Sequence, residues 1–186
     1  ILFDNGEPAV VDAGNLVYPQ KTFSAERYTL WNTRAAYHNI PLIGGEEQRE
    51  GAEYRATNVE LAESGVRMTL QSAYPKEACV KRYSRNLSVG ETVAVEDDLT
   101  LSKPLPVVWV WMFRQRPAYA ANPDGTGAVT AGTLTLRFTA ALDFRCEEIP
   151  VADGRMAQSY PGSLYRVTLA AAPAVSHQCR FLFARG

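Results

Sequence analysis

The feature that most constrains this chain is an alternation of apolar and polar side chains with a period of two. It is clearest at 66–71 and 133–138, where Val, Met, Leu and Phe alternate with Arg, Thr and Gln. Successive side chains of a strand point to opposite faces, so each stretch predicts a strand with one buried and one solvated face. No stretch of useful length carries the apolar stripe of an amphipathic helix. The chain is therefore predicted to be all-β.

Further stretches of apolar and β-branched residues are separated by turn signals such as Ser64-Gly65 and the segment 122–125. The strands predicted from them lie at 1–3, 8–12, 27–31, 53–63, 79–89, 92–101, 107–114, 142–149, 164–170 and 179–183. In a chain of 186 residues, many strands with frequent turns predict one antiparallel β-sandwich, a single domain over residues 1–186. The segment 118–132, rich in small residues, Gly and Pro, is predicted to be the most mobile loop.

Charge and composition exclude several classes of protein. The formal net charge is −1, which lacks the basic excess typical of a nucleic-acid-binding protein. No uninterrupted apolar run approaches the roughly 20 residues that a membrane-spanning helix needs. The cysteines Cys79, Cys146 and Cys179 are odd in number and lack CxxC spacing, which argues against a disulfide framework and against a cysteine zinc site. One disulfide with one spare thiol is left open.

The first residues indicate a piece of a larger protein. Residues 1–3 have the pattern of the end of a strand, residues 4–6 that of a tight turn, and residues 8–12 that of a second strand. A hairpin with part of its first strand missing is an unusual start for a natural chain. The lack of a targeting segment then says nothing about where the whole protein resides.

The stretch 107–113 is apolar on both faces, with Trp109 and Trp111 projecting to one side. Such a strand is typical of the centre of a sheet that is covered on both sides, which is the interpretation we favour. The alternative is that one face docks on a domain outside this chain.

Polar residues that could carry chemistry gather in two early segments. Asp12 follows an apolar strand, so its carboxylate is expected at a strand end. Further on, Arg34, Tyr37, His38 and Asn39 lie close together in the sequence. If that segment is extended, Arg34 and His38 share one face, while Tyr37 and Asn39 point to the other.

These residues also have purely structural interpretations. Asp12 could accept backbone hydrogen bonds in the following turn, and His38 could bond within the sandwich without meeting a metal. One His and one Asp are weak evidence for zinc, which usually takes three or four protein ligands. Arg34 and Tyr37 could be packing residues. His177 has no motif around it and is predicted to be a surface residue.

Two early stretches carry a more specific pattern. One runs from Phe3 to Tyr18 and contains Asp-Ala-Gly-Asn at 12–15, and the other runs from Tyr37 to Gln48 and contains His-Asn-Ile-Pro. In this order they resemble the β-domain of the heparinase II/III-like polysaccharide lyases. Weaker similarity extends the match over nearly the whole chain, at 73–85, 96–98, 148–156 and 164–166.

The resemblance implies a larger protein with an N-terminal α/α toroid, a C-terminal β-sandwich and a substrate cleft between them. Such enzymes cleave uronate-containing acidic polysaccharides by β-elimination, and a secreted or periplasmic location is expected. The proton at C5 of the uronate is weakly acidic. The reaction therefore needs a group that neutralises the carboxylate, a base, and an acid for the departing oxygen. In the family the base and the acid are Tyr and His.

Residue by residue, the resemblance implies that Asp12 and His38 are metal ligands, in a zinc site held by two His and one Asp. The other His ligand and the catalytic His would precede Ile1, so this chain is expected to contain no catalytic residue, to be inactive alone, and to bind zinc weakly or not at all. Arg34, Tyr37 and Asn39 are expected to bind substrate. Arg34 suits bidentate recognition of a carboxylate or sulfate.

Two other functions are left open. A non-catalytic carbohydrate-binding module would stack sugar rings on an exposed aromatic row, for which the candidates are Trp31, Trp109 and Trp111. A structural domain that braces a neighbour would expose a large apolar patch and lack a polar cluster around Asp12 and His38.

Overall fold

The computed structural model describes residues 1–14, 16–17 and 19–186. Of the motif residues above, Asn15 and Tyr18 lie outside the described residues. Antiparallel strands dominate the chain and helix is scarce, which confirms the all-β prediction. No helix in the described part is both long enough and apolar enough to cross a membrane.

The strands are named in chain order and are short except for two. They are β1 (Leu2–Asp4), β2 (Glu7–Val10), β3 (Pro41–Ile43), β4 (Thr57–Ala62), β5 (Gly65–Thr69), β6 (Val80–Val89), β7 (Val93–Phe113), β8 (Ala118–Ala121), β9 (Gly127–Ala131), β10 (Leu134–Phe138), β11 (Asp143–Pro150) and β12 (Ser163–Arg185). The helical turns are η1 (Gln20–Phe23), η2 (Ala25–Thr29), η3 (Trp31–Thr33), η4 (Ala35–Tyr37), η5 (Gln71–Ala73), η6 (Lys76–Ala78) and α1 (Met156–Ser159).

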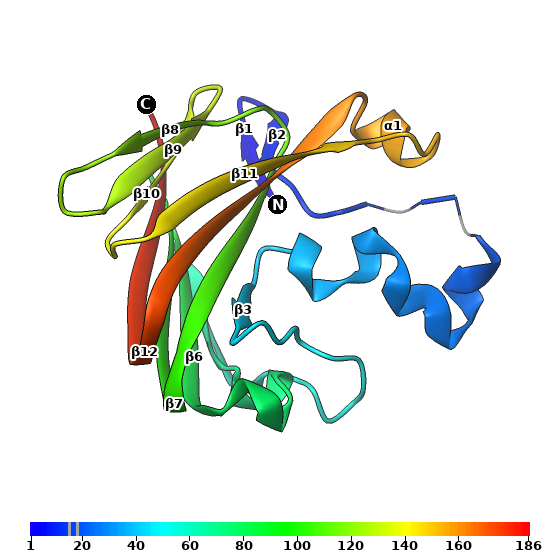
Figure 1. Cartoon of the computed structure of the whole chain (residues 1–186). Helices are drawn as coiled ribbons and strands as arrows, with labels where there is room; N and C mark the ends of the chain where they lie inside the picture. The colour runs from blue at the N-terminus through cyan, green and yellow to red at the C-terminus, as the bar shows by residue number, and fades with distance from the viewer. Residues whose placement is uncertain (15, 18) are drawn as a thin grey trace.

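The two long strands, β7 and β12, take part in both layers of the sandwich (Figure 1). In the first layer the order is β4-β5-β6-β7-β12-β10-β9-β8, and it uses the N-terminal half of β7 and the C-terminal half of β12. In the second layer the other halves of β7 and β12 pair with each other, β11 pairs with β12, and β3 and β2 pair with β7. A shift of register on β12 between Ala171 and Ser176 separates the two halves.

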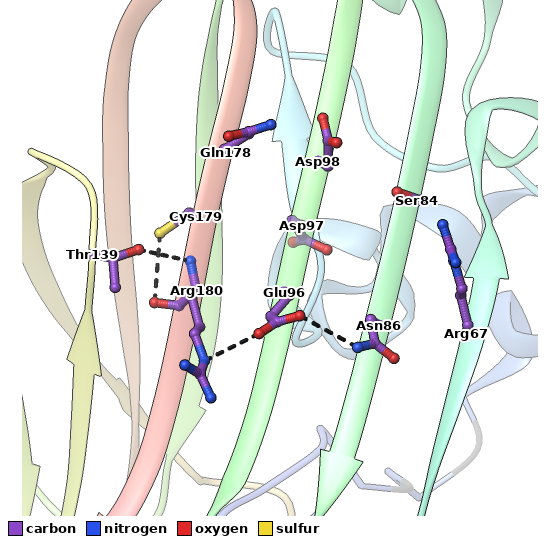
Figure 2. Close-up of a pocket in the computed structure, with 10 residues that line it drawn as sticks. All are labelled: Arg67, Ser84, Asn86, Glu96, Asp97, Asp98, Thr139, Gln178, Cys179 and Arg180. Atoms are coloured by element: carbon purple, nitrogen blue, oxygen red, sulfur yellow. Dashed lines mark hydrogen bonds and ion pairs between the residues drawn. The ribbon is translucent and has the colours of Figure 1, made fainter. Parts of the chain in front are cut away.

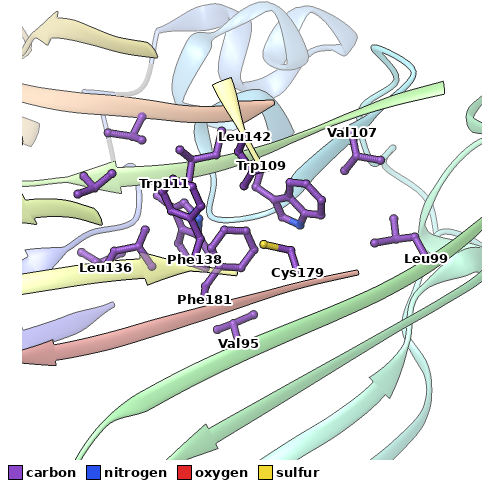
Figure 3. Close-up of a cluster of buried hydrophobic side chains, with 14 of the residues drawn as sticks. Val95, Leu99, Val107, Trp109, Trp111, Leu136, Phe138, Leu142, Cys179 and Phe181 are labelled. Carbon is purple, nitrogen blue, oxygen red and sulfur yellow. The ribbon is translucent and has the colours of Figure 1, made fainter. Parts of the chain in front are cut away.

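The core between the layers is built from aromatic side chains of β7 and β12 (Figure 3). Trp111 packs edge to face on Phe181 and Phe183, with ring centroids 5.1 and 5.0 Å apart. Trp109 lies 5.5 Å from Phe181. Such aromatic contacts add to the free energy gained by burying apolar surface.

The other face of β7 is buried as well. Val110 and Met112 point away from the main core into a smaller cluster that includes Val11 and Tyr160. The prediction of a central strand covered on both sides is therefore confirmed, and the chain itself supplies the cover.

Two secondary-structure predictions are wrong. The segment 27–31 is not a strand but contains the end of η2 and the start of η3, which meet at Leu30. Hydroxyl groups bond the local backbone there: Thr29 Oγ1 donates to the Glu26 carbonyl at 2.7 Å and Thr33 Oγ1 to the Leu30 carbonyl at 2.9 Å. The predicted loop 118–132 forms the β8–β9 hairpin. Its strands were hidden because β8 has no buried residue and β9 buries one large apolar side chain, Val129, between Gly127 and Ala131.

Two smaller expectations concerned the cysteines and His177. All three cysteines are free thiols, so the open possibility of a disulfide is not realised. Cys179 is buried, and burial raises the pKa of its thiol to about 12. The prediction that His177 is a surface residue is wrong, because its side chain is buried. Its Nε2 lies 2.9 Å from the Leu105 carbonyl and 3.1 Å from that of Ala174.

Candidate functional site

Asp12 and His38 meet at the surface of the second layer. Asp12 follows β2, where the backbone N–H of Val11 extends the pairing with β7 by donating to the Met112 carbonyl at 2.8 Å. His38 follows η4 directly, so the segment 34–39 is not continuously extended and the condition for Arg34 and His38 to share one face of a strand is not met. The Nδ1 atom of His38 is in direct hydrogen-bond contact with Oδ1 of Asp12. The His38 side chain is 28% exposed and the Asp12 side chain 52%.

The contact shifts the pKa of both groups. The hydrogen bond to Asp12 raises the pKa of His38 against the opposing effect of burial, and the carboxylate charge and the backbone of Asn32 act in the same direction. Burial alone would raise the pKa of Asp12, but the hydrogen bond and charge of His38 outweigh it and lower that pKa. The pair therefore favours a carboxylate beside an imidazolium.

Asn39 fixes the two chain segments that carry this pair. Its Nδ2 donates to the Val11 carbonyl at 2.8 Å, and its Oδ1 accepts from the Met112 N–H at 2.8 Å. The side chain of Asn39 thus connects the residue after His38 both to Val11, which precedes Asp12, and to Met112 on β7. Both of these hydrogen bonds are to the backbone.

A buried ion pair holds the backbone of Asn39 from the other side. Arg85 Nη1 donates to the Asn39 carbonyl at 3.1 Å, while its Nε and Nη2 both bond Asp97 at 2.7 Å. The Asp97 side chain is 0% exposed and that of Arg85 is 10% exposed. Trp109 Nε1 also donates to Asp97, at 2.8 Å. These bonds connect the inner side of the first layer to the loop that presents His38.

His38 opens onto a polar cavity of about 660 Å³. Its wall includes Tyr28, Arg34, His38, Glu47, Arg49 and Glu50. Arg34 bonds Glu47 through Nη2 at 2.5 Å and Nε at 3.2 Å. A guanidinium has five N–H donors, so Arg34 keeps donors for a ligand in the cavity.

The structure places the predicted substrate-binding residues in different surroundings. Arg34 lines the cavity together with His38. Tyr37 packs its ring edge on Trp31, with centroids 5.4 Å apart, under the guanidinium of Arg166 at 5.1 Å. Asn39 is engaged with the backbone, as described above. Tyr37 and Asn39 are not among the cavity-lining residues.

Sequence reasoning missed Glu47. Its Oε1 binds Arg34, and its Oε2 accepts from the Ala36 N–H at 3.1 Å, so it fixes the turn just before His38. The available signal was the charged run that follows Gly44-Gly45. A run of this kind is more often a solvated surface, which is why the pattern alone assigned it no role.

The residues present do not make a complete zinc site. His38 Nδ1 contacts Asp12 directly, which leaves no room for an ion between these two atoms. Within the described residues, no group of three or more His, Cys, Asp or Glu side chains could hold a metal ion. Zinc sites usually have three or four protein ligands, so the ligand set here is short of that number.

Comparisons with known proteins find similar structures but no similar sequence family. No family model matches the sequence, and no curated protein matches it. Among solved structures, heparinase III superposes with a TM-score of 0.65 at 11% identity over 97% of this chain, and heparan sulfate lyase HepC from Pedobacter heparinus with 0.62 at 15% over 97%. The chain shares its fold with a domain of heparinase III.

The match has two limits. The chain spans 28% of the heparinase III chain and 29% of the HepC chain. A 4-alpha-glucanotransferase from Thermococcus litoralis, an enzyme with a different name and reaction, matches at a TM-score of 0.50, with 13% identity over 88% of this chain and 26% of its own. At such identities the likeness shows the fold, and the reaction has to be argued from the site.

Proposed function

We propose that this chain is the β-sandwich domain of a polysaccharide lyase that cleaves uronate-containing acidic polysaccharide by β-elimination. The observation that carries the proposal is the contact of Asp12 with His38, since His38 lines a cavity whose wall also contains Arg34. The fold shared with heparinase III and HepC supports it. Because this chain spans less than a third of those chains, we propose that an α/α toroid domain completes the substrate cleft.

The cavity fits an anionic substrate through its cationic groups. Arg34 and Arg49 offer guanidinium donors, and such groups bind carboxylate or sulfate oxygens with two parallel hydrogen bonds. Neutralising the uronate carboxylate stabilises the negative charge that develops when the C5 proton leaves. Arg34 is therefore proposed to recognise the substrate anion.

His38 is proposed to lie at the substrate with its ring fixed by Asp12. Because Asp12 and the Asn32 backbone favour the protonated imidazole, His38 suits hydrogen-bond donation and charge stabilisation better than proton abstraction. The base and the acid are proposed to come from the completing domain. Tyr37 supports the η4 turn through its packing, and Asn39 acts as a positioning residue rather than as a direct ligand.

Neither alternative function is favoured by an observation. Of the three candidates for an exposed aromatic row, Trp109 and Trp111 are buried and Trp31 is half-buried, so these three side chains do not form such a row. The hypothesis of a purely structural domain predicts no polar cluster around Asp12 and His38. In the structure, Arg34 and Glu47 lie beside His38 in the wall of the same cavity. As the proposed substrate is a polymer found outside cells, we propose a secreted or periplasmic protein.

The test is a lyase assay that follows the ultraviolet absorbance of the unsaturated uronate product. Heparan sulfate is offered to this chain alone and to the same chain joined to its toroid domain. We expect product from the joined protein and none from the chain alone, because the base and acid are proposed to lie elsewhere. Product from the chain alone would show that the roles are assigned wrongly, and a joined protein inactive on every uronate polymer would refute the lyase proposal.

A further inference from the structure

A second cavity lies on the outer face of the first layer and has a volume of about 790 Å³ (Figure 2). It extends across four adjacent strands, β5, β6, β7 and β12, with Thr139 at one end. It is larger than the cavity beside His38 and shares no lining residue with it.

Strand register arranges the lining side chains in rows. Arg67 pairs with Asn86, Asn86 with Glu96, and Glu96 with Arg180. The next row is Ser84, Asp98 and Gln178. With neighbouring strands about 4.8 Å apart, the first row is about 14 Å long, which is enough for more than one sugar ring.

The rows face away from the candidate active site. Asn86 is adjacent to Arg85 on β6 and Glu96 is adjacent to Asp97 on β7, and successive side chains of a strand point to opposite faces. The Arg85–Asp97 pair points inward toward the loop that carries His38. The rows therefore form a separate surface, open to solvent.

The carboxylates of this surface are already neutralised. Glu96 accepts from Asn86 Nδ2 at 3.3 Å and pairs with Arg180 Nε at 3.1 Å. Asp98 is held by two nitrogens of Arg82, at 2.8 and 2.9 Å. Arg67, by contrast, is exposed and lines the cavity, and it has no hydrogen bond or ion pair among the described contacts.

Unused hydrogen-bonding groups remain after this pairing. Arg67 keeps all five N–H donors, and Arg180 keeps its Nη donors. The Gln178 amide and the Ser84 hydroxyl make no bond among the described contacts, and Asn86 keeps its carbonyl oxygen. Alternating donors and acceptors suit the hydroxyl groups of a sugar, and one free guanidinium suits an anionic group on it.

We propose that this cavity is a binding subsite for an acidic oligosaccharide, whose carboxylate or sulfate binds Arg67 and whose hydroxyl groups bind Ser84, Asn86 and Gln178. The class of ligand rests on the proposed function, whereas the site is separate from the one around His38. Holding a second part of the polymer here would raise its local concentration at the cleft.

The test is binding of a heparan sulfate hexasaccharide to the whole chain, measured by titration calorimetry and by amide shifts in ¹H–¹⁵N NMR spectra. Maltohexaose is the neutral probe of equal length. We expect the acidic probe to shift the amides of Arg67, Asn86 and Gln178, and to bind at least about tenfold more tightly than the neutral one.

Arg67→Ala should weaken binding about tenfold, the effect of one lost charge-assisted hydrogen bond. Arg67→Lys keeps the charge but not the planar fork, so an intermediate loss is expected. The matched control is Arg145→Ala, which removes an exposed arginine of β11 in the other layer. Since Arg67 makes no bond among the described contacts, its replacement should leave the fold intact.

Equal binding by Arg67→Ala and the unchanged protein, or equal binding of the two probes, would overturn the inference. Shifts confined to residues around His38 would also overturn it and leave the lyase proposal standing. Shifts at the rows, combined with a joined protein that forms no unsaturated uronate, would support the subsite and refute the lyase proposal.

Discussion

Arg85→Met is expected to lower the free energy of unfolding by about 3–5 kcal/mol, because it leaves the Asp97 carboxylate buried without its partner. Asp97 is fully buried and, among the hydrogen bonds of the described residues, would keep one side-chain donor, the indole of Trp109. The Asn39 carbonyl would lose its guanidinium donor as well. Urea unfolding followed by Trp fluorescence measures the change.

The chain offers a matched control on the same strand. Arg82 also makes a two-nitrogen pair with an aspartate, Asp98, but its side chain is 54% exposed. Arg82→Met should cost less than about 1 kcal/mol, since water screens an exposed pair and solvates the carboxylate left behind. Equal losses of unfolding free energy for the two variants would show that the Arg85–Asp97 ion pair does not stabilise the fold as a buried pair should.

Asn39→Ala is expected to destabilise the chain by about 1–3 kcal/mol and to separate Asp12 from His38. Alanine supplies neither the donor that the Val11 carbonyl receives nor the acceptor for the Met112 N–H, and it adds no charge beside His38. The measurements are urea unfolding and the NMR titration of His38. The pKa of His38 should fall toward its ordinary value, because the Asp12 contact is what raises it.

Asn86→Ala is the comparison variant for Asn39. It removes an exposed amide with one hydrogen bond, to Glu96, so its effect on stability should stay within about 0.5 kcal/mol. The His38 titration should not change. If Asn39→Ala also leaves that titration unchanged, then Asn39 does not position His38 and Asp12.

The fold could be predicted where burial is one-sided. The stretches 66–71 and 133–138 gave strands because their alternation reflects a sheet with one face on the core. The stretch 27–31 has apolar residues but no alternation, and local hydroxyl bonds decided its conformation instead. The pattern at 118–132 was unreadable because Val129 is the one large apolar residue among the buried positions of β9, and β8 has no buried position.

The site could be predicted only in part. The resemblance paired Asp12 with His38, and the two do converge. Their role as metal ligands stays a prediction. The Arg85–Asp97 pair was missed because it depends on the register of β6 against β7. The sequence pattern alone does not fix that register. The signal for the pair was two opposite charges at equal distances from the turn between β6 and β7.

The most direct test of the central claim is the lyase rate of His38→Ala in the protein joined to its toroid domain. If His38 lies at the substrate with its ring fixed by Asp12, kcat/KM on heparan sulfate should fall at least about 100-fold, as for the loss of a group that stabilises developing charge. Arg145→Ala should keep the full rate. A His38→Ala protein that folds normally and keeps its full rate would contradict the account.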